Sequence, residues 1–235
     1  MRLLIKILKC ELFRQLRNPL CIVYLILPFL SVAISLATVK ERINMFEVVC
    51  GSYAAGILTM FMRDNMMAWL VISVILIAQN FRSSYNIFNR TLPASKVARW
   101  GAVTLSMWII STIHWLIFFI LFSVSSRALI GTSLILRIMI LGSILVCGGI
   151  MILLCSIAQI IRNPILFTIS FFIIFVFMSA ISDFQNYNIF AYAIITPNLV
   201  SDTYATNTMF FLEFVLPIYY VITWVIGLMG FNHRI

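Results

Sequence analysis

The chain has few charged residues, and this scarcity decides its class. Asp, Glu, Lys and Arg make up 10% of the 235 residues, hydrophobic residues make up 63%, and the mean hydropathy is +1.10. A soluble domain carries roughly 25% charged residues. Because so little charge cannot keep a protein surface in water, lipid must be the solvent around much of this chain. The sequence therefore predicts an all-α, polytopic membrane protein with one domain, residues 1–235.

Motifs for catalysis and metal binding are also missing. No lysine follows a glycine, which excludes a Walker phosphate loop, and the chain contains no HExxH sequence. The five cysteines form no CxxC pair, and we expect free thiols. The net charge is +9, and the basic residues lie in short stretches between apolar runs. This pattern is typical of segments that set membrane topology and not of a nucleic-acid-binding surface. We therefore expect no enzyme, no catalytic residue, no metal and no cofactor in this chain, and no nucleic-acid partner.

Residues 1–18 predict an amphipathic helix that lies in the membrane interface. Leucine and isoleucine recur at helical spacing at positions 3, 4, 7, 8, 12 and 16, and basic residues occupy other angles. The segment has too many charges to span, so its apolar face should enter the lipid and its cations should meet anionic headgroups. The charged residues on this helix that we expect to be functional are Lys6, Lys9, Glu11, Arg14 and Arg17.

Six apolar stretches follow that are suited to cross a bilayer. The expected spans are residues 20–39, 60–80, 100–123, 134–159, 165–181 and 210–230. Lys40-Glu41-Arg42 is expected to end the first span. Residues 46–59 are expected to form a reentrant segment or a helical extension in the outer leaflet, and residues 182–208 form a long polar outer segment.

The distribution of basic residues predicts the orientation. The segments expected on the same side of the membrane as the amino terminus hold 11 of the 16 lysines and arginines. Because basic residues gather on the cytoplasmic side, both termini and the loop 80–99 should be cytoplasmic. The charges inside spans two, four and six lie near the outer ends of these spans, within reach of water: Arg63, Asp64, Arg137 and Glu213. For Arg63 and Asp64 we expect an outer anchor rather than a gate. No ion relay crosses the membrane, so energy for any uphill transport should come from a partner.

The order of these parts resembles the permease subunit of type-2 ATP-binding-cassette exporters. Leu16-Arg17-Asn18-Pro19 joins the amphipathic helix to the first span, Leu92-Pro93-Ala94-Ser95-Lys96 lies in the basic loop, Arg162-Asn163-Pro164 joins spans four and five, and Thr196-Pro197 precedes span six. The chain is most similar to small permeases of Gram-positive bacteria that expel antimicrobial or toxin peptides, such as lantibiotic-immunity and phenol-soluble-modulin exporters. The loop lacks the Glu-Arg start and the Gly-Thr step that are common in larger members.

This resemblance implies partners and a mechanism. Two permease subunits, identical or paralogous, would form the path for a hydrophobic or amphipathic peptide in a bacterial cell membrane. A cytosolic ATP-binding subunit would bind ATP and Mg²⁺. Residues 1–18 would be a connecting helix, residues 80–99 would hold a coupling helix, and residues 182–208 would form outer half-helices. The implied coupling residues are Arg82, Tyr85, Phe88, Arg90, Leu92, Pro93 and Lys96.

The residues also admit other interpretations. Tyr85, Phe88 and Leu92 are spaced to form one apolar helical face, but a loop that only sets topology explains the basic residues equally well. A stand-alone intramembrane protease could pair His114 with Cys147 or Cys155, although the simpler prediction for His114 is a helix-packing imidazole with a backbone partner. A membrane assembly factor and an ion-coupled secondary transporter are also compatible with a polytopic chain of this composition.

Overall fold

The computed structural model describes residues 2–50, 53–80, 94–126, 134–161, 163–180, 189 and 210–232, and nearly all of them are helical. The elements are α1 (Arg2–Leu16), α2 (Pro19–Cys50), α3 (Tyr53–Asn80), α5 (Lys96–Ser126), α6 (Leu134–Ile160), α7 (Pro164–Ala180), the π-helical turn η3 (Phe211–Val215) and α10 (Leu216–Asn232). The all-α fold class is thus confirmed. The expected outer segment, residues 182–208, lies outside the described residues apart from the helical, buried Ile189.

Four of these helices are long and apolar enough to cross a membrane, which indicates a multi-pass membrane protein. The four segments are Pro19–Thr38, Lys96–Val124, Leu141–Ile160 and Phe211–Phe231. Two shorter apolar helices, Asp64–Asn80 and Pro164–Val176, coincide with the second and fifth expected spans.

Helix α2 continues beyond the first span. The candidate span is Pro19–Thr38, which agrees with a span that ends near Lys40-Glu41-Arg42, but α2 itself continues as a helix to Cys50. Of the two alternatives for residues 46–59, the helical extension agrees with the structure and the reentrant segment does not, because the described part of this stretch extends α2 and α3 as regular helix. Lysine, glutamate and arginine are good helix formers, so they end an apolar stretch without breaking the hydrogen-bond ladder.

Asparagine and serine side chains begin three of the helices. Asn18 Oδ1 accepts a hydrogen bond from the N–H of Leu20 at 3.0 Å, and Asn163 Oδ1 accepts one from the N–H of Ile165 at 2.9 Å. In both places a proline follows the cap, where its fixed φ suits the first helical turn and its missing N–H costs nothing. Ser95 Oγ caps α5 through the N–H of Ala98 at 3.2 Å. The Asn-Pro steps therefore fix where α2 and α7 start.

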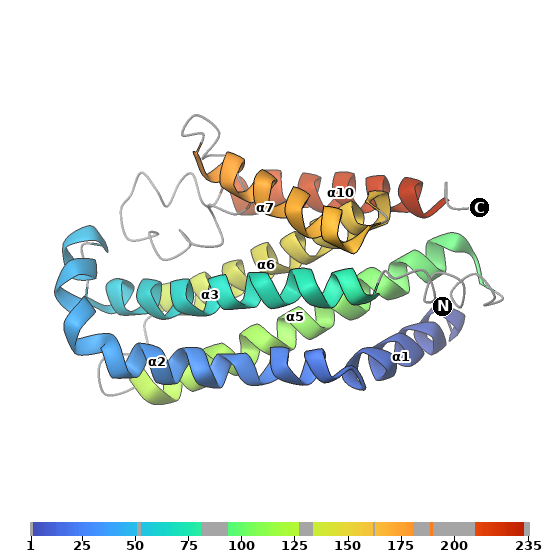
Figure 1. The fold of residues 1–235 in the computed structure, drawn as a ribbon. Coiled ribbons are helices and arrows are strands. Elements are labelled where there is room, and N and C mark those ends of the chain that lie inside the picture. The colour runs from blue at the N-terminus through green and yellow to red at the C-terminus, as the bar shows by residue number, and fades with distance from the viewer. Residues whose placement is uncertain are drawn as a thin grey trace.

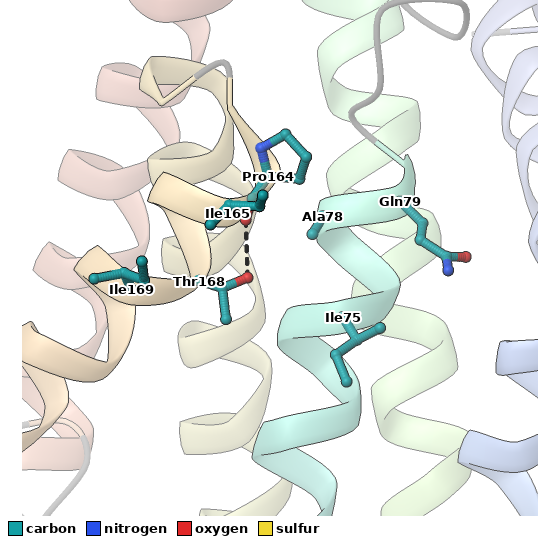
Figure 2. A pocket seen from close by; sticks show the side chains of 7 residues that line it. All are labelled: Ile75, Ala78, Gln79, Pro164, Ile165, Thr168 and Ile169. Carbon is teal, nitrogen blue, oxygen red and sulfur yellow. Dashed lines mark hydrogen bonds between the residues drawn. The ribbon is translucent and has the colours of Figure 1, made fainter.

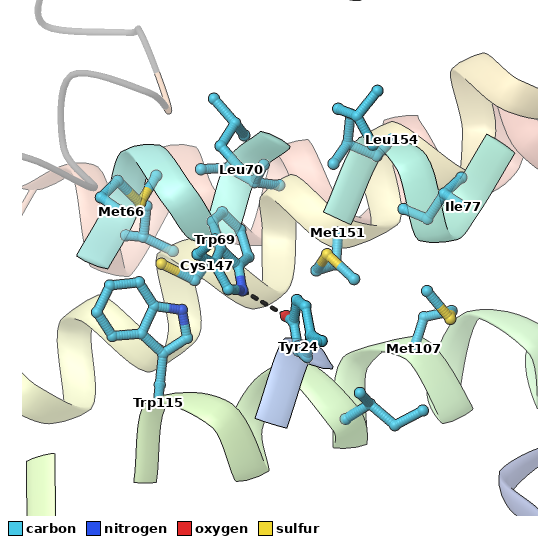
Figure 3. Close-up of a cluster of buried hydrophobic side chains, with 14 of the residues drawn as sticks. Tyr24, Met66, Trp69, Leu70, Ile77, Met107, Trp115, Cys147, Met151 and Leu154 are labelled. Atoms are coloured by element: carbon cyan, nitrogen blue, oxygen red, sulfur yellow. Dashed lines mark hydrogen bonds between the residues drawn. The ribbon is translucent and has the colours of Figure 1, made fainter. Parts of the chain in front are cut away.

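Helix α6 is the centre of the bundle. It packs against α5, α10, α3 and α7, while α2 packs mainly against α3 and α5 (Figure 1). Large side chains fill the interior, and Trp69, Trp115 and Tyr24 are completely buried among the methionines and leucines of α3, α5 and α6 (Figure 3). The start of α1 and the end of α10 lie at the same end of the bundle, which we call the α1 end (Figure 1).

Glycines allow α10 to approach α5 and α6 closely. A Cβ on Gly227 of α10 would overlap the Trp100 ring and lie 2.5 Å from Ser156 Oγ. In α6, a Cβ on Gly148 would overlap the Trp108 indole, whose Nε1 donates to the Tyr220 hydroxyl at 3.1 Å. Any larger residue at these positions must push helices apart or displace an indole ring.

Candidate functional site

The candidate site is the α1 end, where α1 is joined to α3 by polar side chains. Asn80, the last residue of α3, accepts a hydrogen bond from Arg14 Nη1 at 3.2 Å and donates one from Nδ2 to Gln15 Oε1 at 2.7 Å. Its Nδ2 also lies 3.7 Å from Met107 Sδ on α5. One buried asparagine thus binds two consecutive residues of α1 and contacts a third helix.

The acidic residue of α1 belongs to the same cluster. Glu11 is 3% exposed, and its Oε2 accepts hydrogen bonds from Arg14 Nε and Nη2 at 3.2 and 3.1 Å. Arg14 therefore bridges Glu11 and Asn80. A charge-assisted pair that is mostly removed from water holds its geometry more firmly than a pair on an open surface, so α1 has a defined position against the bundle.

The face of α1 that packs against the bundle was not predicted. The face turned toward the bundle carries Ile7, Glu11 and Gln15, spaced four residues apart, and two of these three are polar. Leu3 and Leu16, which we expected on the face that enters the lipid, are exposed, whereas Ile7 of the same expected face is buried against the bundle. The reason is a tertiary contact: Asn80 offers hydrogen-bond partners to α1, so polar side chains gain more by facing inward than leucines do.

The remaining sequence-predicted residues of this end divide into two groups. Lys6, Lys9 and Arg17 are exposed, and Lys96 is half-buried at the first residue of α5. The coupling candidates Arg82, Tyr85, Phe88, Arg90, Leu92 and Pro93 lie outside the described residues, so their role stays a prediction.

The four outer charges are placed only in part. Asp64 is half-buried, and its Oδ2 accepts a hydrogen bond from Ser35 Oγ of α2 at 3.0 Å. Glu213 is exposed in η3, just before Pro217. The backbones of Arg63 and Arg137 belong to α3 and α6, but their side chains are outside the described residues. Asp64 therefore links two helices in addition to any anchoring role.

A second polar cluster lies inside the bundle, around a proline. Pro28 of α2 has no N–H to donate to the carbonyl of Tyr24, four residues earlier. His114 of α5 replaces that donor: its Nδ1 lies 2.7 Å from the Tyr24 oxygen. A carbonyl oxygen only accepts, so Nδ1 carries the proton and Nε2 accepts from Asn65 Nδ2 of α3 at 3.2 Å. The simpler prediction for His114, a packing imidazole with a backbone partner, is confirmed.

The chain of hydrogen bonds continues back to α2. Ser31 Oγ lies 2.9 Å from Asn65 Oδ1 and 3.1 Å from the Pro28 carbonyl. Trp69 Nε1 of α3 donates to the Tyr24 hydroxyl. These bonds hold α2, α3 and α5 together at a depth where an unpaired polar group is costly. Both ring nitrogens of His114 are occupied, which argues against a general base aimed at Cys147 or Cys155.

A cavity of about 340 Å³ opens on the side of the bundle between α3 and α7. Its walls are Ile75, Ala78, Gln79, Pro164, Ile165, Thr168 and Ile169 (Figure 2). Thr168 uses its hydroxyl on the Pro164 carbonyl of its own helix at 2.9 Å, and Gln79 points away from α7 (Figure 2). The cavity therefore presents hydrocarbon, and it suits an aliphatic chain better than a polar ligand.

Sequence reasoning missed Gln15, Asn65 and Asn80. In the sequence, Asn65 belongs with Arg63 and Asp64 to a polar break between two apolar pieces, and Asn80 stands at the start of a loop. Isolated amides within or at the end of an apolar run were the available signal, since such groups need partners in a bilayer. Among the described residues, no group of three His, Cys, Asp or Glu side chains is placed to hold a metal ion.

Comparison with known proteins identifies no relative. No protein-family model matches the chain, no curated protein is significantly similar to it, and no solved structure matches its fold.

Proposed function

We propose that the chain is the membrane-spanning subunit of an ATP-driven exporter. With a second permease subunit it would form the path for a hydrophobic or amphipathic substrate, such as a toxin or antimicrobial peptide, and a separate cytosolic ATPase would supply the energy. The observation that carries this proposal is the anchoring of α1 through Asn80, the residue from which the chain enters the expected coupling segment.

The helix arrangement supports the proposal. Besides the four candidate spans, α3 contains 28 residues and α7 contains 17. At ~1.5 Å per residue these helices are about 42 and 26 Å long, against a hydrocarbon core of about 30 Å. Six membrane-crossing helices would put both ends of the chain on one side of the membrane, and the excess of basic residues supports the cytoplasm as the side of the α1 end.

The placement of carboxylates supports an external energy source. Within the candidate spans and the two shorter apolar helices, the acidic residues are Asp64 and Glu213, and both lie near the end opposite to α1. Asp64 is engaged by Ser35. An ion-coupled transporter needs a carboxylate or similar group along the ion's path, so a nucleotide-driven partner fits these helices better.

The α1 end supplies a physical route for coupling. A displacement of residues 81–93 pulls on Asn80, which is bound to Arg14 and Gln15 of α1 and contacts Met107 of α5. An ATPase that moves this segment would therefore move α1, α3 and α5 together. The lateral cavity between α3 and α7 supports an apolar cargo, because its lining offers little to a charged one.

Affinity purification from the native membrane tests the proposal. The tagged chain, solubilised in a mild detergent, should retain a soluble nucleotide-binding subunit. A variant with residues 81–93 in scrambled order should lose that subunit. A variant with residues 196–208 scrambled, which has the same length on the opposite side, should keep it. Failure of the natural chain to retain any nucleotide-binding protein would contradict the exporter assignment.

A further inference from the structure

The exposed face of α1 is a cationic stripe with apolar borders. Lys6, Lys9, Phe13 and Arg17 are all exposed, and their spacing of three and four residues places them along one line of the helix. Apolar residues lie beside this line, since Leu3, Ile5 and Leu16 are 44 to 50% exposed. The Arg17 guanidinium lies 4.3 Å from the centre of the Phe13 ring, which is itself 58% exposed.

The stripe carries positive charge without compensation from its own helix. The acid of α1, Glu11, faces the bundle and is paired with Arg14. Within the described residues, the structure gives Lys6, Lys9 and Arg17 no carboxylate partner. The inward position of Glu11, which the sequence pattern did not predict, is therefore what leaves the exposed face of α1 without a carboxylate.

We propose that this stripe, Lys6, Lys9, Phe13 and Arg17, binds the headgroups of anionic phospholipids in the leaflet that α2 enters. Arg17 lies two residues before the candidate span begins at Pro19, so the stripe starts at the membrane surface. Anionic headgroups match its cations, and the exposed leucine, isoleucine and phenylalanine side chains enter the acyl region between the headgroups. An acidic protein surface would satisfy the cations but leave this apolar border in water, so lipid is the better partner.

Cys10 provides a reporter for the test, because it is exposed and lies beside Lys9. The full chain, with Cys50 replaced by serine, is labelled at Cys10 with bimane and placed in phosphatidylcholine nanodiscs. A small, fixed mole fraction of lipid carries a nitroxide quencher near its headgroup, on either phosphatidylglycerol or phosphatidylcholine. We expect stronger quenching by phosphatidylglycerol, and the difference should shrink at high salt because the contact is electrostatic.

Two triple variants give matched comparisons. Neutralising the stripe (Lys6→Gln, Lys9→Gln and Arg17→Gln) should reduce the preference for phosphatidylglycerol by about fivefold for each charge removed. Exchanging the cations (Lys6→Arg, Lys9→Arg and Arg17→Lys) should preserve it. Tryptophan fluorescence of the buried core reports whether each variant is folded.

Equal quenching by the two lipids in the natural sequence would overturn the proposal. It would also be overturned if the neutralised and charge-preserving variants showed the same preference, because the signal would then come from other basic residues. The proposal does not depend on the exporter function, because the two experiments can fail separately. A chain that retains an ATPase but shows no lipid selectivity would contradict only the lipid proposal. A chain that shows lipid selectivity but retains no ATPase would contradict only the exporter function.

Discussion

The bond between His114 and the Tyr24 carbonyl makes a prediction that a double-mutant cycle measures. Replacing His114 with phenylalanine keeps an aromatic ring but removes both polar nitrogens. The Tyr24 carbonyl, already denied a helical donor by Pro28, and the Asn65 amide then lose their partner. A buried polar group left unsatisfied costs about 1–3 kcal/mol in protein interiors. We expect His114→Phe to lower the free energy of unfolding by an amount in this range.

The cycle isolates the part that belongs to the proline. In a Pro28→Ala background, residue 28 has an N–H that reaches the Tyr24 carbonyl within α2. The Asn65 amide loses its partner in both backgrounds, so that contribution cancels. Hydrogen bonds between membrane helices average about 0.6 kcal/mol and reach about 1.7 kcal/mol. We therefore expect His114→Phe to cost about 0.6–1.7 kcal/mol less in the Pro28→Ala background.

Reversible unfolding in mixed detergent micelles, followed by tryptophan fluorescence, measures all four corners of the cycle. Thr112→Val is the matched control on α5, because the Thr112 hydroxyl donates only to the Trp108 carbonyl of its own helix in the described contacts, at 2.9 Å. We expect it to change stability by less than about 0.5 kcal/mol. If His114→Phe is harmless, or equally costly in both backgrounds, the histidine does not replace the donor that Pro28 lacks.

Three further predictions concern packing and access. Gly227→Ala should lower the free energy of unfolding by about 1–3 kcal/mol, because the new methyl group overlaps the Trp100 ring. Gly101→Ala is the control and should be neutral or slightly stabilising, because nothing lies within 4 Å of a Cβ at that position. Equal effects of the two substitutions on unfolding in detergent would refute this packing. A membrane-permeant maleimide should modify Cys10 in the folded protein far faster than Cys147, which is buried, and similar rates measured by mass spectrometry would contradict that burial. Asn80→Leu should increase hydrogen exchange in α1 while leaving α6 protected, since it removes the bonds to Arg14 and Gln15; unchanged exchange in α1 would show that other contacts hold it.

The sequence predicts the helices of this protein better than their contacts. Apolar runs of about 20 residues predicted the all-α membrane class and most of the helices, because a chain in lipid must form its backbone hydrogen bonds internally. Asn18-Pro19 and Asn163-Pro164 were also readable, since a cap and a proline act within one turn. The continuation of α2 past Lys40 was not predicted, because hydropathy marks the edge of the lipid and not the end of a helix.

The polar contacts depend on distant residues and were out of reach. The rotation of α1 depends on Asn80, 65 residues after Gln15 in the chain. The role of His114 depends on Pro28, which lies on another helix. Periodicity within α1 indicated an apolar face for the lipid, but it did not indicate that Glu11 and Gln15 would face the bundle. The sequence thus indicated α1 as part of the candidate site, but it did not indicate Asn80, the amide that joins α1 to α3.

The unequal burial of α6 and α7 has a consequence for how this sequence can change. Most of α6 within its candidate span is enclosed by other helices, and residues such as Gly148 lie against side chains of both α5 and α10. In α7, by contrast, Ile165, Ile173 and Val176 are each more than 60% exposed. Substitutions between aliphatic residues should therefore accumulate freely along α7, whereas α6 should vary only in concert with its neighbours. A comprehensive library of variants, selected for folded protein, would show α7 as the most permissive helix and α6 as the least.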